Sequence, residues 1–107
     1  MNDSKILERG AIALVNVFTA KPGQLDEFCD AQIAEYERLQ GRVDGALGNR
    51  LYKQSGGRKA VNIAYFSSRE KYDAWRASDL FKEHFSRIDK FLDNVEPDLF
   101  EVVYESE

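Results

Sequence analysis

The spacing of apolar residues predicts four strands and two helical segments. Strands are expected over Ala11–Thr19, Leu47–Gln54, Ala60–Phe66 and Leu99–Tyr104, and helical spacing covers Gln24–Gln40 and Ser67 to about Asp93. The element order is βαββαβ. Because strand–helix–strand connections are right-handed, this order gives a four-stranded antiparallel sheet with both helices on one face. The expected fold class is therefore α+β, a ferredoxin-like sandwich.

The first strand is apolar on both faces. One face carries Ile12, Leu14, Asn16 and Phe18, and the other carries Ala13, Val15 and Val17. Two helices can cover only one face of the sheet, and an apolar patch of this size is seldom left exposed on a monomer. The pattern predicts a homodimer in which two sheets pack face to face. The alternative is a monomer with an exposed binding face.

The second helical segment contains the only tryptophan and the only histidine of the chain, Trp75 and His84. On one straight helix the intervening residues turn roughly 900°, which would place the two side chains on opposite sides. Ser78 and Asp79 lie between them, and both residue types are favoured at the start of a helix. A helix that ends and restarts here would bring both side chains to the sheet side.

A buried asparagine, tryptophan or histidine is, taken singly, most often an ordinary part of a core. Asn16 is expected to face the helices, because it shares a strand face with Leu14 and Phe18. Together with Trp75 and His84 it indicates a pocket that is lined by residues of three separate segments. The aromatic residues expected to line that pocket and contact a flat aromatic ligand are Phe18, Phe66, Phe81 and Phe85.

Composition narrows the class of protein. The chain has 107 residues, which favours a single domain over 11–107 after a polar, mobile tail over 1–10. Its net charge of −4, without a basic stripe, argues against nucleic acid as a partner. No long apolar run or signal peptide is present in the sequence, so we expect no membrane partner and a cytoplasmic location. The single cysteine, Cys29, cannot form an internal disulfide and is expected to be buried.

Other motifs add little chemistry. The sequence contains no zinc pattern, P-loop or dinucleotide fingerprint, and no metal is expected. The carboxylates of Glu35, Glu37, Glu70 and Glu83 are interpreted as solvated helix faces.

The chain resembles the antibiotic biosynthesis monooxygenase family of dimeric α+β barrels. The resemblance is carried by VNVFTAKPGQLDEF, Val15–Phe28, and AWRASDLFKEHF, Ala74–Phe85, and extends over about Ala11–Tyr104. It implies a homodimer that forms a dimeric α/β barrel, with a pocket between helices and sheet in each subunit.

Some members of this family are cofactor-free monooxygenases that oxidise polycyclic phenols to quinones. The resemblance implies that Asn16 and Trp75 orient the substrate and handle dioxygen, with His84 as a third catalytic residue. A phenol is first deprotonated, the phenolate passes an electron to O2, and an amide or indole N–H stabilises the anionic oxygen species. The expected partners are a small aromatic or quinone-type substrate and O2, without a cofactor.

Two alternatives remain open. A second branch of the family degrades haem, and likeness to it implies His84 as the iron ligand, Trp75 against the macrocycle, and Asn16 near bound oxygen. Charge for the propionates would then come from Arg76, Lys82 and Arg87. The other alternative is a non-catalytic barrel whose pocket binds a ligand or is filled by side chains.

Overall fold

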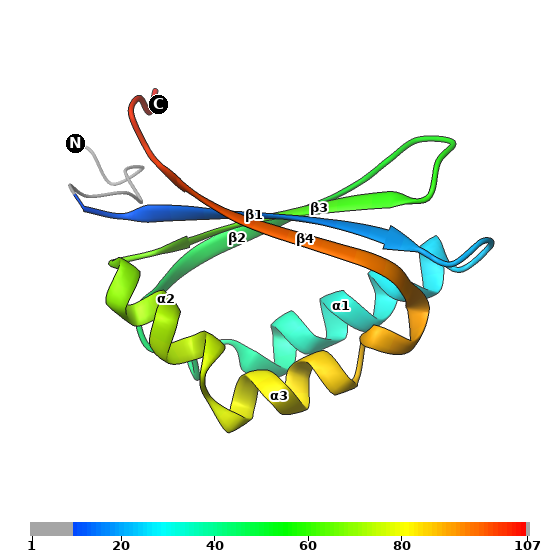
Figure 1. The fold of residues 1–107 in the computed structure, drawn as a ribbon, viewed down its shortest axis with the longest axis horizontal. Helices are drawn as coiled ribbons and strands as arrows, with labels where there is room; N and C mark the ends of the chain where they lie inside the picture. Colours follow the sequence, from blue (N-terminus) through cyan, green and yellow to red (C-terminus); the bar gives the residue numbers. More distant parts are fainter. Residues whose placement is uncertain (1–9, 107) are drawn as a thin grey trace.

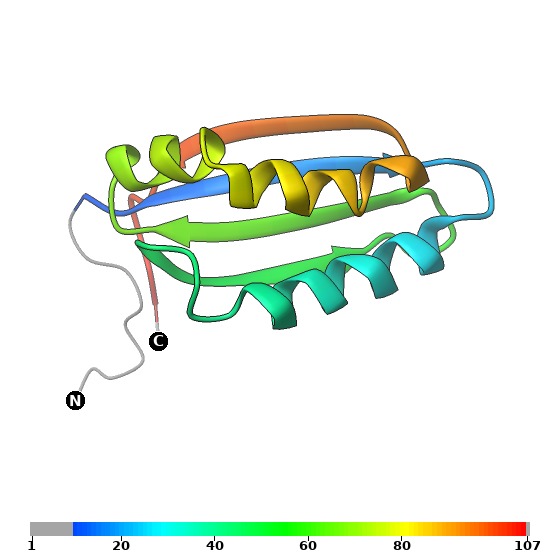
Figure 2. The same ribbon diagram turned by 90° about the horizontal axis from the view of Figure 1, so that it is seen from below.

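The computed structural model describes residues 10–106 and confirms a ferredoxin-like α+β fold (Figure 1). Its elements are β1 (Ile12–Ala20), α1 (Leu25–Leu39), β2 (Ala46–Lys53), β3 (Lys59–Phe66), α2 (Arg69–Arg76), α3 (Asp79–Ser86), the short 3-10 helix η1 (Asp89–Phe91) and β4 (Leu92–Glu101). The strands follow the order β2-β3-β1-β4, and every neighbouring pair is antiparallel. All three α-helices lie on one face of the sheet (Figures 1 and 2). Except for Gly10, the tail expected over 1–10 lies outside the described residues.

The second helical segment is divided where the sequence allowed a break. α2 ends at Arg76 and α3 begins at Asp79, after Ser78. The Ser78 hydroxyl accepts a hydrogen bond from the backbone N–H of Phe81 at 3.1 Å and donates one to the Trp75 carbonyl at 2.7 Å. One side chain thus satisfies groups from both helix ends, which fixes the bend. The cap of α2 is Ser68, one residue after Ser67, where the helical spacing was predicted to begin.

The last strand starts earlier than predicted. Helical structure ends at Ser86 apart from η1, and β4 covers Leu92–Glu101, whereas the sequence pattern predicted a helix to about Asp93 and a strand over Leu99–Tyr104. Pro97 lies within β4. Because β4 is an edge strand, a residue without a backbone N–H is tolerated there.

The core between sheet and helices has two parts. One contains Phe18, Ala20, Phe28, Cys29, Ala60 and Ile88, and the other contains Leu14, Phe66 and Tyr72. Burial of Cys29 is as predicted. On β1, Asn16 lies between Leu14 of one cluster and Phe18 of the other. The polar residue thus marks the place where the apolar packing is interrupted.

No described helix covers the opposite face of the sheet (Figure 1). Cross-strand pairing places the following side chains on this outer face: Ala13, Val15, Val17, Tyr52, Val61, Ile63, Tyr65 and Phe100. Tyr52 and Phe100 are about half exposed, at 48% and 52%. The centre of the outer face is therefore apolar, and the charged residues Arg50, Glu96 and Asp98 share this face on the two outer strands.

Candidate functional site

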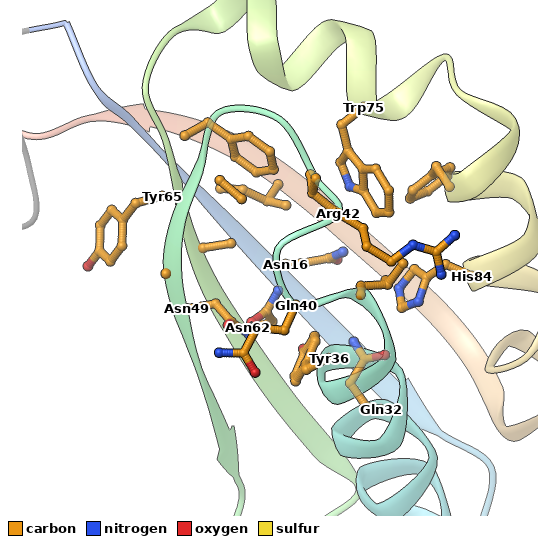
Figure 3. A pocket seen from close by; sticks show the side chains of 18 of the residues that line it. Asn16, Gln32, Tyr36, Gln40, Arg42, Asn49, Asn62, Tyr65, Trp75 and His84 are labelled. Atoms are coloured by element: carbon orange, nitrogen blue, oxygen red, sulfur yellow. Dashed lines mark hydrogen bonds between the residues drawn. The ribbon is translucent and has the colours of Figure 1, made fainter.

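A cavity of about 830 Å³ lies between the sheet and the helices (Figure 3). All seven residues singled out from the sequence line it, namely Asn16, Phe18, Phe66, Trp75, Phe81, His84 and Phe85. Because the helix breaks at Ser78, Trp75 at the end of α2 and His84 on α3 reach the same space. The structure thus brings the predicted residues together, and their chemical roles remain predictions.

One wall of the cavity is aromatic. The Trp75 ring meets the Phe81 ring edge-on at a centroid distance of 5.4 Å, and Phe81 stacks on Phe85 at 6.1 Å. The His84 ring lies 6.0 Å from Trp75. Such a wall can contact the faces and edges of a flat aromatic molecule.

The floor opposite this wall carries amides. Asn16 on β1 lies directly across from Asn62 on β3, and Asn62 is buried. The Asn49 amide on β2 donates a hydrogen bond to Asn62 Oδ1 at 3.1 Å. Gln32 and Tyr36 join this floor from α1 (Figure 3). The cavity therefore has an aromatic side and an amide-rich side.

Three buried polar atoms in the cavity lining have no hydrogen-bond partner in the structure. They are Asn16 Oδ1, Gln32 Oε1 and the Tyr36 hydroxyl. Burial raises the pKa of Tyr36, and the nearby amides of Gln32 and Asn49 offset this effect only in part. Because a buried polar group without a partner costs free energy, three such atoms around one hollow indicate a place for a polar ligand.

His84 is buried and contacts a carboxylate. Its Nδ1 lies 3.2 Å from Oε1 of Glu35 on α1, and both side chains are largely shielded from solvent. Burial lowers the pKa of His84, and the contact with Glu35 opposes this shift without cancelling it. Hydrogen bonds from Arg38 lower the pKa of Glu35 against the effect of burial, and the His84 contact adds to the lowering. We therefore describe His84 as neutral and Glu35 as ionised at neutral pH.

Charged residues also reach the edge of the cavity. Arg76 lies with its guanidinium 4.7 Å from the Phe81 ring centroid, and Arg42 lines the cavity from the segment after α1. Of the basic residues suggested for haem propionates, Arg76 lines the cavity, whereas Lys82 and Arg87 do not. Over residues 10–106, no group of three or more His, Cys, Asp or Glu side chains is arranged to hold a metal ion.

A sequence model of the antibiotic biosynthesis monooxygenase family matches residues 11–87, which include both motifs and the whole aromatic wall. The chain belongs to this family. No described helix is long and apolar enough to cross a membrane.

Several solved structures share the fold at low sequence identity. A candidate antibiotic biosynthesis monooxygenase of Bordetella bronchiseptica aligns with a TM-score of 0.79 at 17% identity, over 90% of this chain and 100% of that one. SnoaB of Streptomyces nogalater, a cofactor-independent oxygenase, aligns with a TM-score of 0.76 at 20% identity, over 89% and 95%. Rv0793 of Mycobacterium tuberculosis gives 0.75 at 18% identity, over 92% and 100%. A search of curated proteins finds no significant match.

Several residues in the cavity of this family member, or in contact with its lining, were missed from the sequence. Asn62 could have been identified in the same way as Asn16, because it is also a polar residue on a strand face that carries apolar residues, here Phe66 and Ala60. Gln32 and Glu35 were missed because the buried stripe of α1 runs through Phe28, Gln32, Glu35 and Leu39, not through Ile33, which is 46% exposed. The interpretation of Glu35 as solvated is wrong, since it is 5% exposed, whereas Glu37, Glu70 and Glu83 are exposed.

Proposed function

We propose that this protein is a cofactor-independent monooxygenase that oxidises a hydroxylated polycyclic aromatic compound with O2. The observation that carries the proposal is the pairing of an aromatic wall with three unpartnered polar atoms across one cavity. Two of these atoms are amide oxygens, which accept hydrogen bonds, so they suit the hydroxyl groups of a phenol. Family membership and the likeness to SnoaB, a cofactor-independent oxygenase, support the same assignment.

In this proposal each predicted site residue has a role that follows from the chemistry of its side chain. The four phenylalanines Phe18, Phe66, Phe81 and Phe85 contact the substrate rings. Asn16 and Trp75 orient the substrate and offer N–H donors to the oxygen that becomes anionic. His84 accepts the phenolic proton. One oxygen atom of O2 forms the new quinone carbonyl and the other leaves as water, so the substrate supplies all the electrons.

Aerobic turnover of a dihydroxyanthrone tests the proposal, because its ring CH2 becomes a carbonyl as one O2 is consumed and one water is formed. We expect quinone absorbance and O2 uptake in a one-to-one ratio, above the rate of autoxidation without protein. Asn16→Ala and His84→Ala should each lower the rate by about 100-fold or more. Asn94→Ala, the same change at an exposed residue of β4, serves as the matched control and should leave the rate unchanged.

The proposal fails if the wild-type protein does not exceed autoxidation for a panel of hydroxylated anthrones and naphthacenes. Saturable binding of those compounds without O2 uptake would assign the protein to the non-catalytic ligand-binding class instead.

A second candidate function, haem binding and degradation, is favoured by the contact between His84 and Glu35. Histidines that bind metals commonly hold their second ring nitrogen against a carboxylate, which leaves Nε2 as the ligand. His84 would hold the iron, and Arg42 and Arg76 would pair with the propionates; the haem would supply the oxygen-activating chemistry. Hemin titration separates the candidates. A Soret band that saturates at one haem per chain and disappears in His84→Ala supports this candidate, and no band rejects it.

We also infer that two copies associate through the outer face of the sheet. Its centre on β1 and β3 is apolar, whereas the outer strands β2 and β4 add both half-exposed aromatic residues and charges: Val15, Val17, Val61 and Ile63 at the centre, Tyr52, Phe100, Arg50, Glu96 and Asp98 at the sides. An apolar face of this extent is seldom left in water on a monomer. Packing two such faces buries them and leaves each cavity, on the helix side, open to its ligand.

A further inference from the structure

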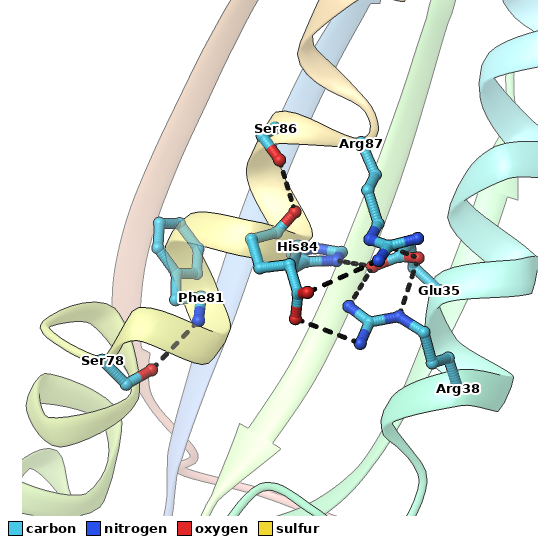
Figure 4. A network of polar contacts seen from close by, with 8 residues as sticks. Glu35, Arg38, Ser78, Phe81, His84, Ser86 and Arg87 are labelled. Atoms are coloured by element: carbon cyan, nitrogen blue, oxygen red, sulfur yellow. Dashed lines mark hydrogen bonds and ion pairs between the residues drawn. The ribbon is translucent and has the colours of Figure 1, made fainter.

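Glu35 is the most buried carboxylate in contact with the proposed active site. It lies on α1 and receives two hydrogen bonds from Arg38, at 2.7 Å to Oε1 and 3.1 Å to Oε2 (Figure 4). Oε1 also contacts His84 Nδ1 at 3.2 Å, and Oε2 lies 3.8 Å from Arg87. A buried carboxylate held in this way from two helices fixes the spacing of α1 and α3 at the cavity.

These contacts determine which ring nitrogen of His84 carries the proton. An ionised carboxylate can only accept hydrogen bonds, and Arg38 keeps Glu35 ionised. The hydrogen between Glu35 and His84 must therefore sit on Nδ1. In the neutral imidazole, Nε2 then carries a lone pair, and it is the ring nitrogen left for a molecule in the cavity.

We propose that Glu35 is a positioning residue that fixes His84 in the Nδ1–H tautomer, so that Nε2 acts as the general base toward a substrate hydroxyl. This inference rests on the proposed function. The substrate O–H bond breaks as the Nε2–H bond forms, and the electron pair stays on the phenolate oxygen. The new imidazolium lies against the Glu35 carboxylate, which stabilises its charge. The same proton later leaves with the water formed from O2.

The charges around this pair are balanced. Glu83 contacts both Arg38 and Arg87 at 3.4 Å, so two carboxylates face two guanidinium groups beside the imidazole. The positive charge of Arg38 lowers the pKa of His84 and so opposes part of the rise that Glu35 causes. The base thus stays unprotonated near neutral pH and yet gains a stabilising partner once it is protonated.

Other titratable groups face the cavity from neighbouring elements. Tyr36 and Glu37 come from α1, Arg42 and Asp44 from the segment after it, and Arg76 from α2. Neither of these carboxylates lies within hydrogen-bonding or ion-pair distance of the imidazole, in contrast to Glu35. Among the strand residues of the lining, Tyr65 is titratable, but its ring points away from the cavity (Figure 3). Neither Arg42 nor Arg76 contacts the imidazole within hydrogen-bonding or ion-pair distance. Glu35 is therefore the group expected to control the tautomer.

The tautomer can be measured directly because the chain has one histidine. In protein without an affinity tag, labelled with nitrogen-15 at histidine, NMR at neutral pH should show a protonated Nδ1 and an unprotonated Nε2. Glu35→Gln, which is nearly isosteric and can donate to Nδ1, and Glu35→Ala should both shift the population toward Nε2–H. Glu83→Gln is the matched control: it removes the same charge from a residue that contacts both arginines but not the imidazole, so the tautomer should not change.

Kinetics with the dihydroxyanthrone provide the second measurement. Glu35→Gln should lower kcat by roughly 10- to 100-fold with little change in KM, since Glu35 orients the base and does not touch the substrate. Loss of the carboxylate also lowers the pKa of His84, so the acidic limb of the pH–rate profile should move to lower pH. Glu83→Gln should keep the wild-type profile.

The outcomes separate the two proposals. An Nε2–H tautomer in the wild-type protein overturns the role of Glu35, whether or not turnover occurs. Turnover with an unchanged kcat and pH profile in Glu35→Gln overturns it as well. An Nδ1–H tautomer that depends on Glu35, in a protein without turnover, overturns the base role together with the proposed function. The tautomer, the kcat loss and the shifted limb together support the inference.

Discussion

The rings of Trp75 and His84 lie 6.0 Å apart although a continuous helix would have turned them to opposite sides. Ser78 brings them together, because its hydroxyl accepts from the first turn of α3 and donates to the last turn of α2. The aromatic wall of the cavity therefore depends on a hydrogen-bonded bend as well as on apolar packing.

Replacing Ser78 with alanine should weaken this bend. Loss of a serine cap costs about 1 kcal/mol of stability, and here the second hydrogen bond to Trp75 is lost too. Urea unfolding should show a free energy of unfolding lower by about 1 to 2 kcal/mol, and the emission of Trp75, the only tryptophan, should change in the folded state.

Ser86→Ala provides the control for this bend. Ser86 is also on α3, and its hydroxyl donates to the Glu83 carbonyl at 2.7 Å, but it is exposed and lies outside the bend. Equal effects of the two substitutions would show that Ser78 has no special role.

The sequence was sufficient for the element order and for two of the residues that interrupt apolar patterns, although the bounds of the last strand and the equivalent residue Asn62 were missed. Asn16 on a strand and His84 on a helix stood out because a polar group among apolar neighbours needs a partner or a ligand. Glu35 did not stand out, because an acidic residue on a helix is usually solvated and its two arginine partners lie on two helices. Its burial depends on how far α1 is rotated about its axis, and this rotation buries Gln32 while it leaves the apolar Ile33 exposed. Rotation of that kind is set by tertiary packing and leaves no local signal.

The stability of the protein should depend on pH through His84. The folded-state pKa of His84 is lowered from an ordinary value of 6.5, so as pH falls the unfolded chain binds this proton first. The free energy of unfolding should therefore decrease as pH falls through this ordinary value, and it should stop decreasing through this group below the folded pKa. Denaturant unfolding at a series of pH values measures the slope.

The variant His84→Gln should flatten this slope, because the chain has no other histidine. The lowered pKa of Glu35 also makes the folded protein less stable in acid, but only below its ordinary value of 4.5, which is lower than that of His84. A slope that is as steep in His84→Gln as in the wild type would assign the effect to other groups.

If two copies associate through the outer face, a charged side chain introduced at its centre should prevent the dimer from forming. Ile63 lies opposite Val15 at the centre of that face, and Ile63→Arg would bury a guanidinium between two sheets. Light scattering on a size-exclusion column should show a dimer for the wild type and a monomer for Ile63→Arg. Ile33→Arg places the same charge on an exposed position of α1 and should remain dimeric. A monomeric wild type at micromolar concentration would contradict the proposed homodimer.

The Tyr36 hydroxyl should affect stability and ligand binding in opposite directions. It is buried without a partner in the free protein, so Tyr36→Phe removes an unsatisfied group and should raise the free energy of unfolding by about 1 kcal/mol. A hydroxylated aromatic ligand would supply the missing partner, so the same change should weaken binding of dihydroxyanthraquinone by roughly threefold to tenfold. Quenching of Trp75 emission measures that affinity, with calorimetry as a check.

Tyr65→Phe is the matched control for this last comparison, since the Tyr65 ring points away from the cavity (Figure 3). It should leave the affinity for the quinone unchanged. If Tyr36→Phe destabilised the protein and left the affinity unchanged, the hydroxyl would be a structural group satisfied within the fold. The amide floor would then lose one of the three atoms that indicate a hydroxylated ligand. Opposite signs in the two measurements are expected of a ligand-binding group, because the cost of burying the hydroxyl without a protein partner is carried by the free protein and is recovered in the complex.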